Sequence, residues 1–224
     1  MPARLLLLPG LGADERLFSR LGELCIPIVA ARLPVPEAGE LFTPYALRVA
    51  AQLDLRPEDW IGGSSFGSLV AADIARRRPI GGLVLIGGAL SGTALAASIR
   101  WLGWLADFFV RGSGLRNLCL RPAAFRAAFG KLDADTLALL TAMAKEVPVP
   151  MLRRGFRLLA GCRPRLPVLC PIHAIHGTQD RLLRPPPLPD CRMVAGAGHA
   201  LALSHPREVT AFLNETICRR PAPS

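Results

Sequence analysis

The segment IGGSSFGS, residues 61–68, contains three glycines and three serines and carries no charge. A phosphate-binding loop, a dinucleotide-binding turn and the seat of a nucleophile can each use such a turn. A phosphate-binding loop requires a lysine after its last glycine, where this chain has Ser68. The dinucleotide fingerprint is absent here and also fails at residues 10–15, where Glu15 replaces its third glycine. The pattern that remains is that of a serine nucleophile.

Gly63, Ser65 and Gly67 form the pattern Gly-x-Ser-x-Gly, with an apolar strand-like run before it and a helical pattern after it. The two glycines allow the strand and the helix to approach closely around a sharp, strained turn. Such a turn lifts the serine hydroxyl above a sheet, beside helix amides that favour negative charge. Glycine-rich turns also occur for packing alone, so the functional interpretation depends on partner residues elsewhere.

A serine hydroxyl needs a histidine to accept its proton and a carboxylate to orient that histidine. Of the four histidines, His199 lies in a glycine-rich loop between the last predicted strand and the last predicted helix. Asp180 follows the strand before it. We therefore predict a catalytic set of Ser65, Asp180 and His199. Structural roles are predicted for the other histidines, His173, His176 and His205.

Acyl transfer at Ser65 also requires donors for the oxyanion. One predicted donor is the amide of Phe66, directly after the nucleophile. The other is the amide of Leu11, in the glycine-containing loop after the first predicted strand. A glycine turn that only shapes the chain is the alternative for this loop.

Short apolar runs alternate with amphipathic segments along the chain, which predicts an α/β fold with a mainly parallel sheet flanked by helices. The six predicted strands are residues 4–8, 26–31, 59–64, 82–88, 170–177 and 192–196. The predicted helices are residues 14–24, 43–53, 66–78 and 205–217. Asp14, Thr43 and Ser204 are the predicted N-terminal caps of three of these helices.

The alternation stops between residues 91 and 166, where helical patterns follow one another, separated by glycine and proline. We predict a helical cap inserted at 91–166 into a core made of residues 1–90 and 167–224. Large apolar side chains of the cap are candidates to line a substrate pocket, although packing of the cap on the core is the alternative: Trp101, Trp104, Phe108, Phe109 and Met143.

Composition excludes several other classes of protein. The net charge is +10, but only two of the 27 basic residues are lysines and they form no cluster in the sequence, so no nucleic-acid partner is expected. No apolar run is long enough to span a membrane, and the first one ends at Pro9, so a cytoplasmic protein is expected. The six cysteines show neither metal-site nor disulfide spacing and are expected to be buried thiols. No metal or cofactor is predicted.

The combination of LLLLPGLGADERLF (5–18), GGSSFGS (62–68), HGTQDRLL (176–183) and GAGHALAL (196–203) resembles the α/β-hydrolase superfamily. The resemblance implies a parallel-dominated sheet with a helical cap after the strand that follows the nucleophile helix. Two departures stand out. Pro9 replaces the usual histidine before the oxyanion-loop glycine, and the first two strands of the family are missing, so the sheet starts at the third.

An activated serine with an oxyanion hole transfers acyl groups, and with water as acceptor it hydrolyses them. Cleavage of carboxylic esters is the predicted activity, as in a small capped serine esterase. A thioesterase acting on acyl-CoA or an acyl carrier protein is the first alternative, with the arginines attracting an acidic partner. A lyase, or a non-catalytic binding protein on the same fold, is the second.

Overall fold

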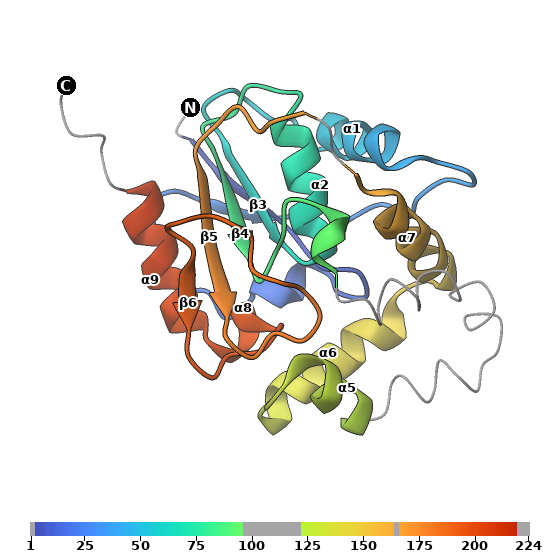
Figure 1. Ribbon diagram of the computed structural model, residues 1–224, viewed down its shortest axis with the longest axis vertical. Coiled ribbons are helices and arrows are strands. Elements are labelled where there is room, and N and C mark those ends of the chain that lie inside the picture. The colour runs from blue at the N-terminus through green and yellow to red at the C-terminus, as the bar shows by residue number, and fades with distance from the viewer. Residues whose placement is uncertain (1–2, 96–121, 164–165, 219–224) are drawn as a thin grey trace.

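The computed structural model describes residues 3–95, 122–163 and 166–218. Its centre is one sheet of six parallel strands in the order β2-β1-β3-β4-β5-β6 (Figure 1). The strands are β1 (Leu5–Leu8), β2 (Ile28–Ala30), β3 (Trp60–Ser64), β4 (Gly82–Ile86), β5 (Ile172–Gly177) and β6 (Arg192–Val194). The predicted sheet is confirmed, with each strand inside its predicted range.

Strand β1 explains why the runs are apolar without alternation. All four of its leucines are buried, yet Leu6 and Leu8 belong to one hydrophobic cluster while Leu5 and Leu7 belong to another. Successive side chains point to opposite faces of a sheet, and helices cover both faces here. A strand buried on both sides therefore consists of apolar residues throughout.

Helices α1 (Phe42–Gln52) and α2 (Phe66–Ala75) cover one face of the sheet. The 3-10 helix η1 (Glu15–Phe18) and the helices α8 (Leu201–Ser204) and α9 (Pro206–Ile217) cover the other (Figure 1). The helix predicted for residues 14–24 was wrong in length. The structure has a single helical turn there, which buries Leu17 and Phe18. It ends because the amides of Ser19 and Leu21 each donate to a carbonyl three residues earlier, in tight turns that do not continue the helix.

Of the three predicted caps, only Asp14 is confirmed, since its side chain accepts a hydrogen bond from the amide of Arg16. Thr43 lies inside the first turn of α1, whose cap position is Leu41. Ser204 is the last residue of α8, and α9 begins at Pro206. The fixed φ of a proline suits the first position of a helix, so α9 needs no side-chain cap to begin there.

The 3-10 helix η2 (Gly92–Ala94) and three α-helices lie between β4 and β5 among the described residues. The α-helices are α5 (Pro122–Phe129), α6 (Ala134–Glu146) and α7 (Val149–Gly161). Figure 1 shows α7 beside α1, and α5 and α6 on the side of the molecule where α8 lies. The division into a cap at 91–166 and a core stays a prediction. No helix in the described ranges is long and apolar enough to cross a membrane.

The cysteine prediction was wrong for one pair, because Cys25 and Cys218 form a disulfide. They are 193 residues apart, but the loop before β2 runs along α9. The amide of Cys25 donates to Asn214 Oδ1 at 3.2 Å, and the Asn214 amide group donates to the carbonyl of Glu23 at 3.0 Å. The remaining described cysteines are free, Cys162 being buried and Cys170 and Cys191 partly buried. Cys119 lies outside the described residues.

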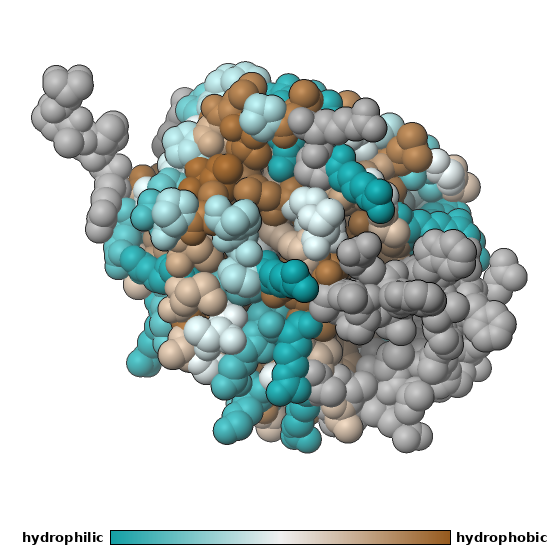
Figure 2. Space-filling view, viewed as in Figure 1, coloured by the Kyte–Doolittle hydropathy of each residue, from teal (hydrophilic) through white to brown (hydrophobic). Residues whose placement is uncertain are grey.

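Hydrophobic side chains gather on the upper part of the face in Figure 2, where the segment leading to β5 crosses the sheet in Figure 1. Leu166 and Leu169 in this segment are 48% and 80% exposed. The segment precedes β5 and so lies at the amino ends of the strands. The residues predicted to be catalytic follow the carboxyl ends.

Candidate active site

Ser65 lies in the turn between β3 and α2 and has φ 51° and ψ −120°. A positive φ is costly for a residue with a side chain and is tolerated where the surroundings enforce it. The flanking glycines show what enforces it. A Cβ on Gly63 would lie 2.5 Å from the carbonyl oxygen of Leu8, and one on Gly67 would overlap the same atom. A Cβ on Gly63 would also lie 2.7 Å from the backbone carbonyl carbon of Gly67, so the strand and the helix meet as closely as the glycine pattern predicted.

The turn is hydrogen-bonded to the segment that follows the neighbouring strand β4. The Ser68 hydroxyl donates to the carbonyl of Ser65 at 2.6 Å and accepts a hydrogen bond from the amide of Ala89 at 2.9 Å. The amide of Ser65 donates to the carbonyl of Gly87 at 3.4 Å. Ser68, which ruled out a phosphate-binding loop, thus holds the nucleophile turn against the segment after β4.

Asp180 and His199 are in direct contact. His199 Nδ1 lies 2.7 Å from Asp180 Oδ2, and Asp180 Oδ1 accepts hydrogen bonds from the amides of Leu182 at 2.8 Å and Leu183 at 3.0 Å. Burial would raise the pKa of Asp180, but the hydrogen bond and charge interaction with His199 and the two amides bring it below its ordinary value. The carboxylate is therefore ionised and fixed in orientation beside the imidazole.

The predicted residues come together around Gly87, at the end of β4. The backbone amide of Ser65 donates a hydrogen bond to the carbonyl of Gly87. A Cβ on Gly87 would lie 3.1 Å from the carbonyl oxygen of His199 and 4.0 Å from Asp180 Oδ2. Within the described residues, no hydrogen bond joins the Ser65 hydroxyl to the His199 ring. The structure thus pairs the acid with the base and places both near the serine.

The loop predicted to supply an oxyanion donor passes directly beside Ser65. A Cβ on Gly10 would lie 3.1 Å from Ser65 Cβ and 3.8 Å from its hydroxyl oxygen. The side chain of Leu11 packs against Gly155 of α7 so closely that a Cβ there would overlap it. Phe66 is the first residue of α2, where amides have no acceptor within the helix. Phe66 thus directly follows the serine, and Leu11 follows the glycine that lies against it.

An aromatic residue of α5, which the sequence analysis did not single out, contacts the candidate base. The Phe129 ring lies 5.6 Å from that of His199, and Phe125 stacks on Phe129 at 5.5 Å. Met143, predicted to line a pocket, is fully buried in the hydrophobic cluster that contains Phe125. The other predicted pocket residues, Trp101, Trp104, Phe108 and Phe109, lie outside the described residues.

His176 was predicted to be structural, but the structure places it on the candidate acid. Its Nε2 atom lies 3.3 Å from Asp180 Oδ2 and 3.2 Å from the carbonyl oxygen of Leu183. The only signal in the sequence is its position four residues before Asp180, at the end of a strand, and many structural histidines share such a position.

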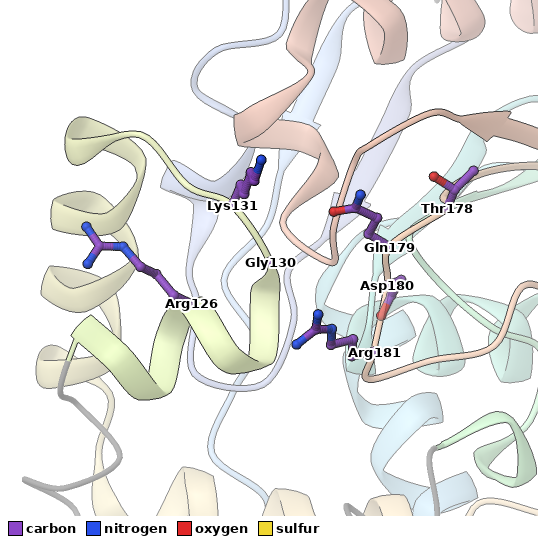
Figure 3. A pocket seen from close by; sticks show the side chains of 7 residues that line it. All are labelled: Arg126, Gly130, Lys131, Thr178, Gln179, Asp180 and Arg181. Atoms are coloured by element: carbon purple, nitrogen blue, oxygen red, sulfur yellow. The ribbon is translucent and has the colours of Figure 1, made fainter.

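An open cavity of about 650 Å³ lies beside Asp180, between the end of α5 and the loop after β5. Figure 3 shows the side chain of Arg181 directed at the end of α5, and the guanidinium of Arg126 directed away from the loop. In the part of the chain that the structure describes, neither arginine nor Lys131 takes part in an ion pair. The lining residues are Arg126, Gly130, Lys131, Thr178, Gln179, Asp180 and Arg181.

The described ranges contain no cluster of three or more histidine, cysteine, aspartate or glutamate side chains arranged to hold a metal ion.

Comparison with known proteins agrees with this architecture. Residues 5–212 match the alpha/beta hydrolase family. Similar solved structures include an esterase from Thermogutta terrifontis, with a TM-score of 0.73 and 17% identity, covering 97% of this chain and 90% of the other. A hydrolase from Pseudomonas aeruginosa has a TM-score of 0.75 and 14% identity over 98% and 91% of the two chains. An N-acyl homoserine lactonase has a TM-score of 0.71 and 18% identity over 100% and 92%. No curated protein matches the sequence.

Proposed function

The chain belongs to the alpha/beta hydrolase family, and from this premise we propose that it is a serine hydrolase that cleaves carboxylic esters. The observation that supports the proposal most strongly is the gathering of three groups around Gly87. A strained Ser65 turn lies there beside an ionised Asp180 that is bound to Nδ1 of His199. A nucleophile, a base and an orienting acid are the parts that acyl transfer requires.

The hydrogen bond to Asp180 defines the role of each nitrogen of His199. Asp180 Oδ2 accepts a hydrogen bond from Nδ1–H, which leaves Nε2 without a proton and able to act as a base. As Ser65 attacks the ester carbonyl, its proton moves to Nε2, and the imidazolium that forms is stabilised by the ionised carboxylate. The hydrogen bond between Ser65 and His199 forms in the complex with substrate, since such contacts commonly tighten on binding.

The rest of the cycle follows from the same positions. The amides of Leu11 and Phe66 bind the oxyanion of the tetrahedral intermediate. His199 returns the proton to the departing alcohol, which leaves an acyl group on Ser65. A water molecule then attacks the acyl carbonyl as Nε2 takes its proton. The second tetrahedral intermediate collapses as His199 returns that proton to Ser65 Oγ, which releases the acid and the free serine.

Hydrolysis of nitrophenyl esters from acetate to decanoate tests the proposal. We expect turnover by the wild type and a fall in kcat of at least about 10⁴-fold for Ser65→Ala. Ser19→Ala, which removes an exposed hydroxyl at the end of η1, is the matched control and retains full activity. An unchanged kcat in a folded Ser65→Ala variant would show that this serine is not the nucleophile.

The cavity beside Asp180 supports a second candidate, a thioesterase that binds acyl-CoA or an acidic acyl carrier protein. Three basic residues line the cavity, and the chain has an excess of ten positive charges. A thioesterase of this kind would prefer acyl-CoA over nitrophenyl esters of the same acyl group, with a kcat/KM that falls as salt rises. Arg181→Gln would raise KM for the thioester only, whereas Arg78→Gln, which removes an exposed charge after α2, would not.

A further inference from the structure

Two imidazole rings lie against the same oxygen of Asp180. Its Oδ2 atom lies 2.7 Å from Nδ1 of His199 and 3.3 Å from Nε2 of His176, while Oδ1 is occupied by two backbone amides. The side chains of His176 and Asp180 are each 1% exposed, so water does not compete for these positions. The carboxylate is thus held by donors from His199, Leu182 and Leu183, and the ring of His176 packs against the oxygen that binds His199.

The surroundings of His176 determine where its proton lies. Nε2 is 3.2 Å from the carbonyl oxygen of Leu183, which can only accept, so Nε2 carries the hydrogen and donates it to that carbonyl. The amide of the same residue donates to Asp180 Oδ1. Nδ1 is buried and has no hydrogen-bond partner. A proton on Nδ1 would therefore create a buried N–H group with no acceptor.

His176 is accordingly a neutral donor. Burial lowers its pKa; the charge of Asp180 and the Leu183 carbonyl oppose this shift, and His199 adds to it. A neutral ring beside Asp180 leaves the charge of the carboxylate to His199, whereas a second imidazolium would compete with His199 for that charge.

We propose that His176 is a positioning residue for the hydrolase reaction. Its Nε2–H holds the carbonyl of Leu183, whose amide binds Asp180 Oδ1, and its ring lies against Oδ2, so that Oδ2 keeps the direction from which it holds Nδ1 of His199. The role rests on the proposed function, because orientation of His199 matters only where that ring accepts a proton from Ser65. Packing alone would be satisfied by an apolar ring at this position, which would also avoid leaving a buried Nδ1 without a partner.

The test compares three variants of the full chain with nitrophenyl acetate as substrate. His176→Phe keeps a ring but has no donor, His176→Asn is polar but too short to reach the Leu183 carbonyl, and His176→Gln places an amide N–H near the original Nε2. We expect kcat to fall about tenfold in the Phe and Asn variants, with KM within a factor of two of the wild type. The Gln variant should recover most of the lost kcat. His205→Phe, at the start of α9, is the matched control and retains the wild-type kcat.

A structural readout separates this proposal from the proposed function. The Nδ1–H proton of His199, observed by NMR in ¹⁵N-histidine-labelled protein, should lie at low field in the wild type. It should move upfield in the Phe and Asn variants and return in the Gln variant. These shifts are expected even if no ester is hydrolysed, in which case only the proposed function fails. A kcat and an Nδ1–H shift that are unchanged in a folded Phe or Asn variant would overturn the role of His176. Equal losses in the Gln and Phe variants would also overturn it, because shape rather than the donor would then matter.

Discussion

The backbone of Gly198 lies directly against the carbonyl oxygen of Phe129, at a separation that leaves no room for a Cβ atom. The end of α5 therefore rests on the residue that precedes His199. The ring of Phe129, the last residue of α5, contacts the His199 ring. The position of the candidate base is thus coupled to a helix inserted between β4 and β5.

Replacing Gly198 by alanine should disturb catalysis more than stability. The added methyl forces α5 or the His199 loop to move, and displacement of a catalytic group by about 1 Å costs on the order of 100-fold in rate. We expect kcat for nitrophenyl acetate to fall at least tenfold, with a small decrease in Tm. Gly161→Ala is the matched control, because a Cβ there meets no atom within 4 Å. Equal kcat values for the two variants would disprove the coupling.

Replacing Ser68 by alanine should destabilise the protein. The change removes the acceptor of the buried Ala89 amide and the hydrogen bond to the Ser65 carbonyl. A buried donor left without a partner costs about 1–3 kcal/mol, which should appear as a lower free energy of unfolding in urea titrations. Ser91→Ala, which removes the exposed capping hydrogen bond of the 3-10 turn at Gly92–Ala94, should cost less. A Ser68→Ala variant as stable as the wild type would mean that the turn is held by other contacts.

The described structure also predicts how stability depends on pH. Burial lowers the pKa of His173 and His176 from the ordinary 6.5, while Asp190 and Asp180 respectively oppose the shift. The unfolded chain then binds protons that the folded chain does not, so stability is full above pH 6.5 and is lost as the pH falls towards the folded pKa values. Between pH 7.5 and 5.5 we expect the free energy of unfolding to fall, by at most about 1.4 kcal/mol for each histidine.

Urea titrations at the two pH values measure this loss. His173→Gln should reduce the loss, because the substitution removes one of the two titrating groups. A free energy of unfolding that stays constant or rises from pH 7.5 to 5.5 would contradict the assigned burial of these rings.

The disulfide between Cys25 and Cys218 should contribute to stability and not to activity. A cross-link between residues 193 apart restricts the unfolded chain strongly, and removal of such bonds typically costs about 2–5 kcal/mol. The loop before β2 lies at the amino ends of the strands, away from Ser65. The double variant Cys25→Ala/Cys218→Ala should therefore unfold at a lower temperature while kcat stays unchanged. Alkylation of both cysteines in the unreduced wild type would contradict the pairing.

The sheet and the nucleophile turn were predictable because their causes are local in the sequence. An uninterrupted apolar run such as residues 5–8 indicates a strand that is buried on both faces. The glycines around Ser65 indicate a turn with no room for side chains. The pairing of Asp180 with His199 could also be predicted, since both follow the carboxyl ends of adjacent strands.

Other features depend on contacts that the sequence does not mark. Cys25 and Cys218 meet because the loop before β2 runs along α9. Their separation in the sequence gives no sign that they pair. Position 198 requires a glycine because the carbonyl of Phe129, about seventy residues earlier in the chain, leaves no room for a Cβ. His176 lies at the end of a strand, where burial and packing are the usual roles, and only the path of residues 178–183 brings the carboxylate of Asp180 back to its ring. Such contacts follow from the fold as a whole.

The central claim is that Ser65 is a nucleophile activated by His199. Reaction with a fluorophosphonate, followed by mass spectrometry of the intact protein and of its peptides, tests it most directly. The account predicts one adduct per chain, located on Ser65, absent in Ser65→Ala and formed at least about 100-fold more slowly in His199→Ala. A folded wild-type protein that gains no adduct, or that carries it on another residue, would contradict the account.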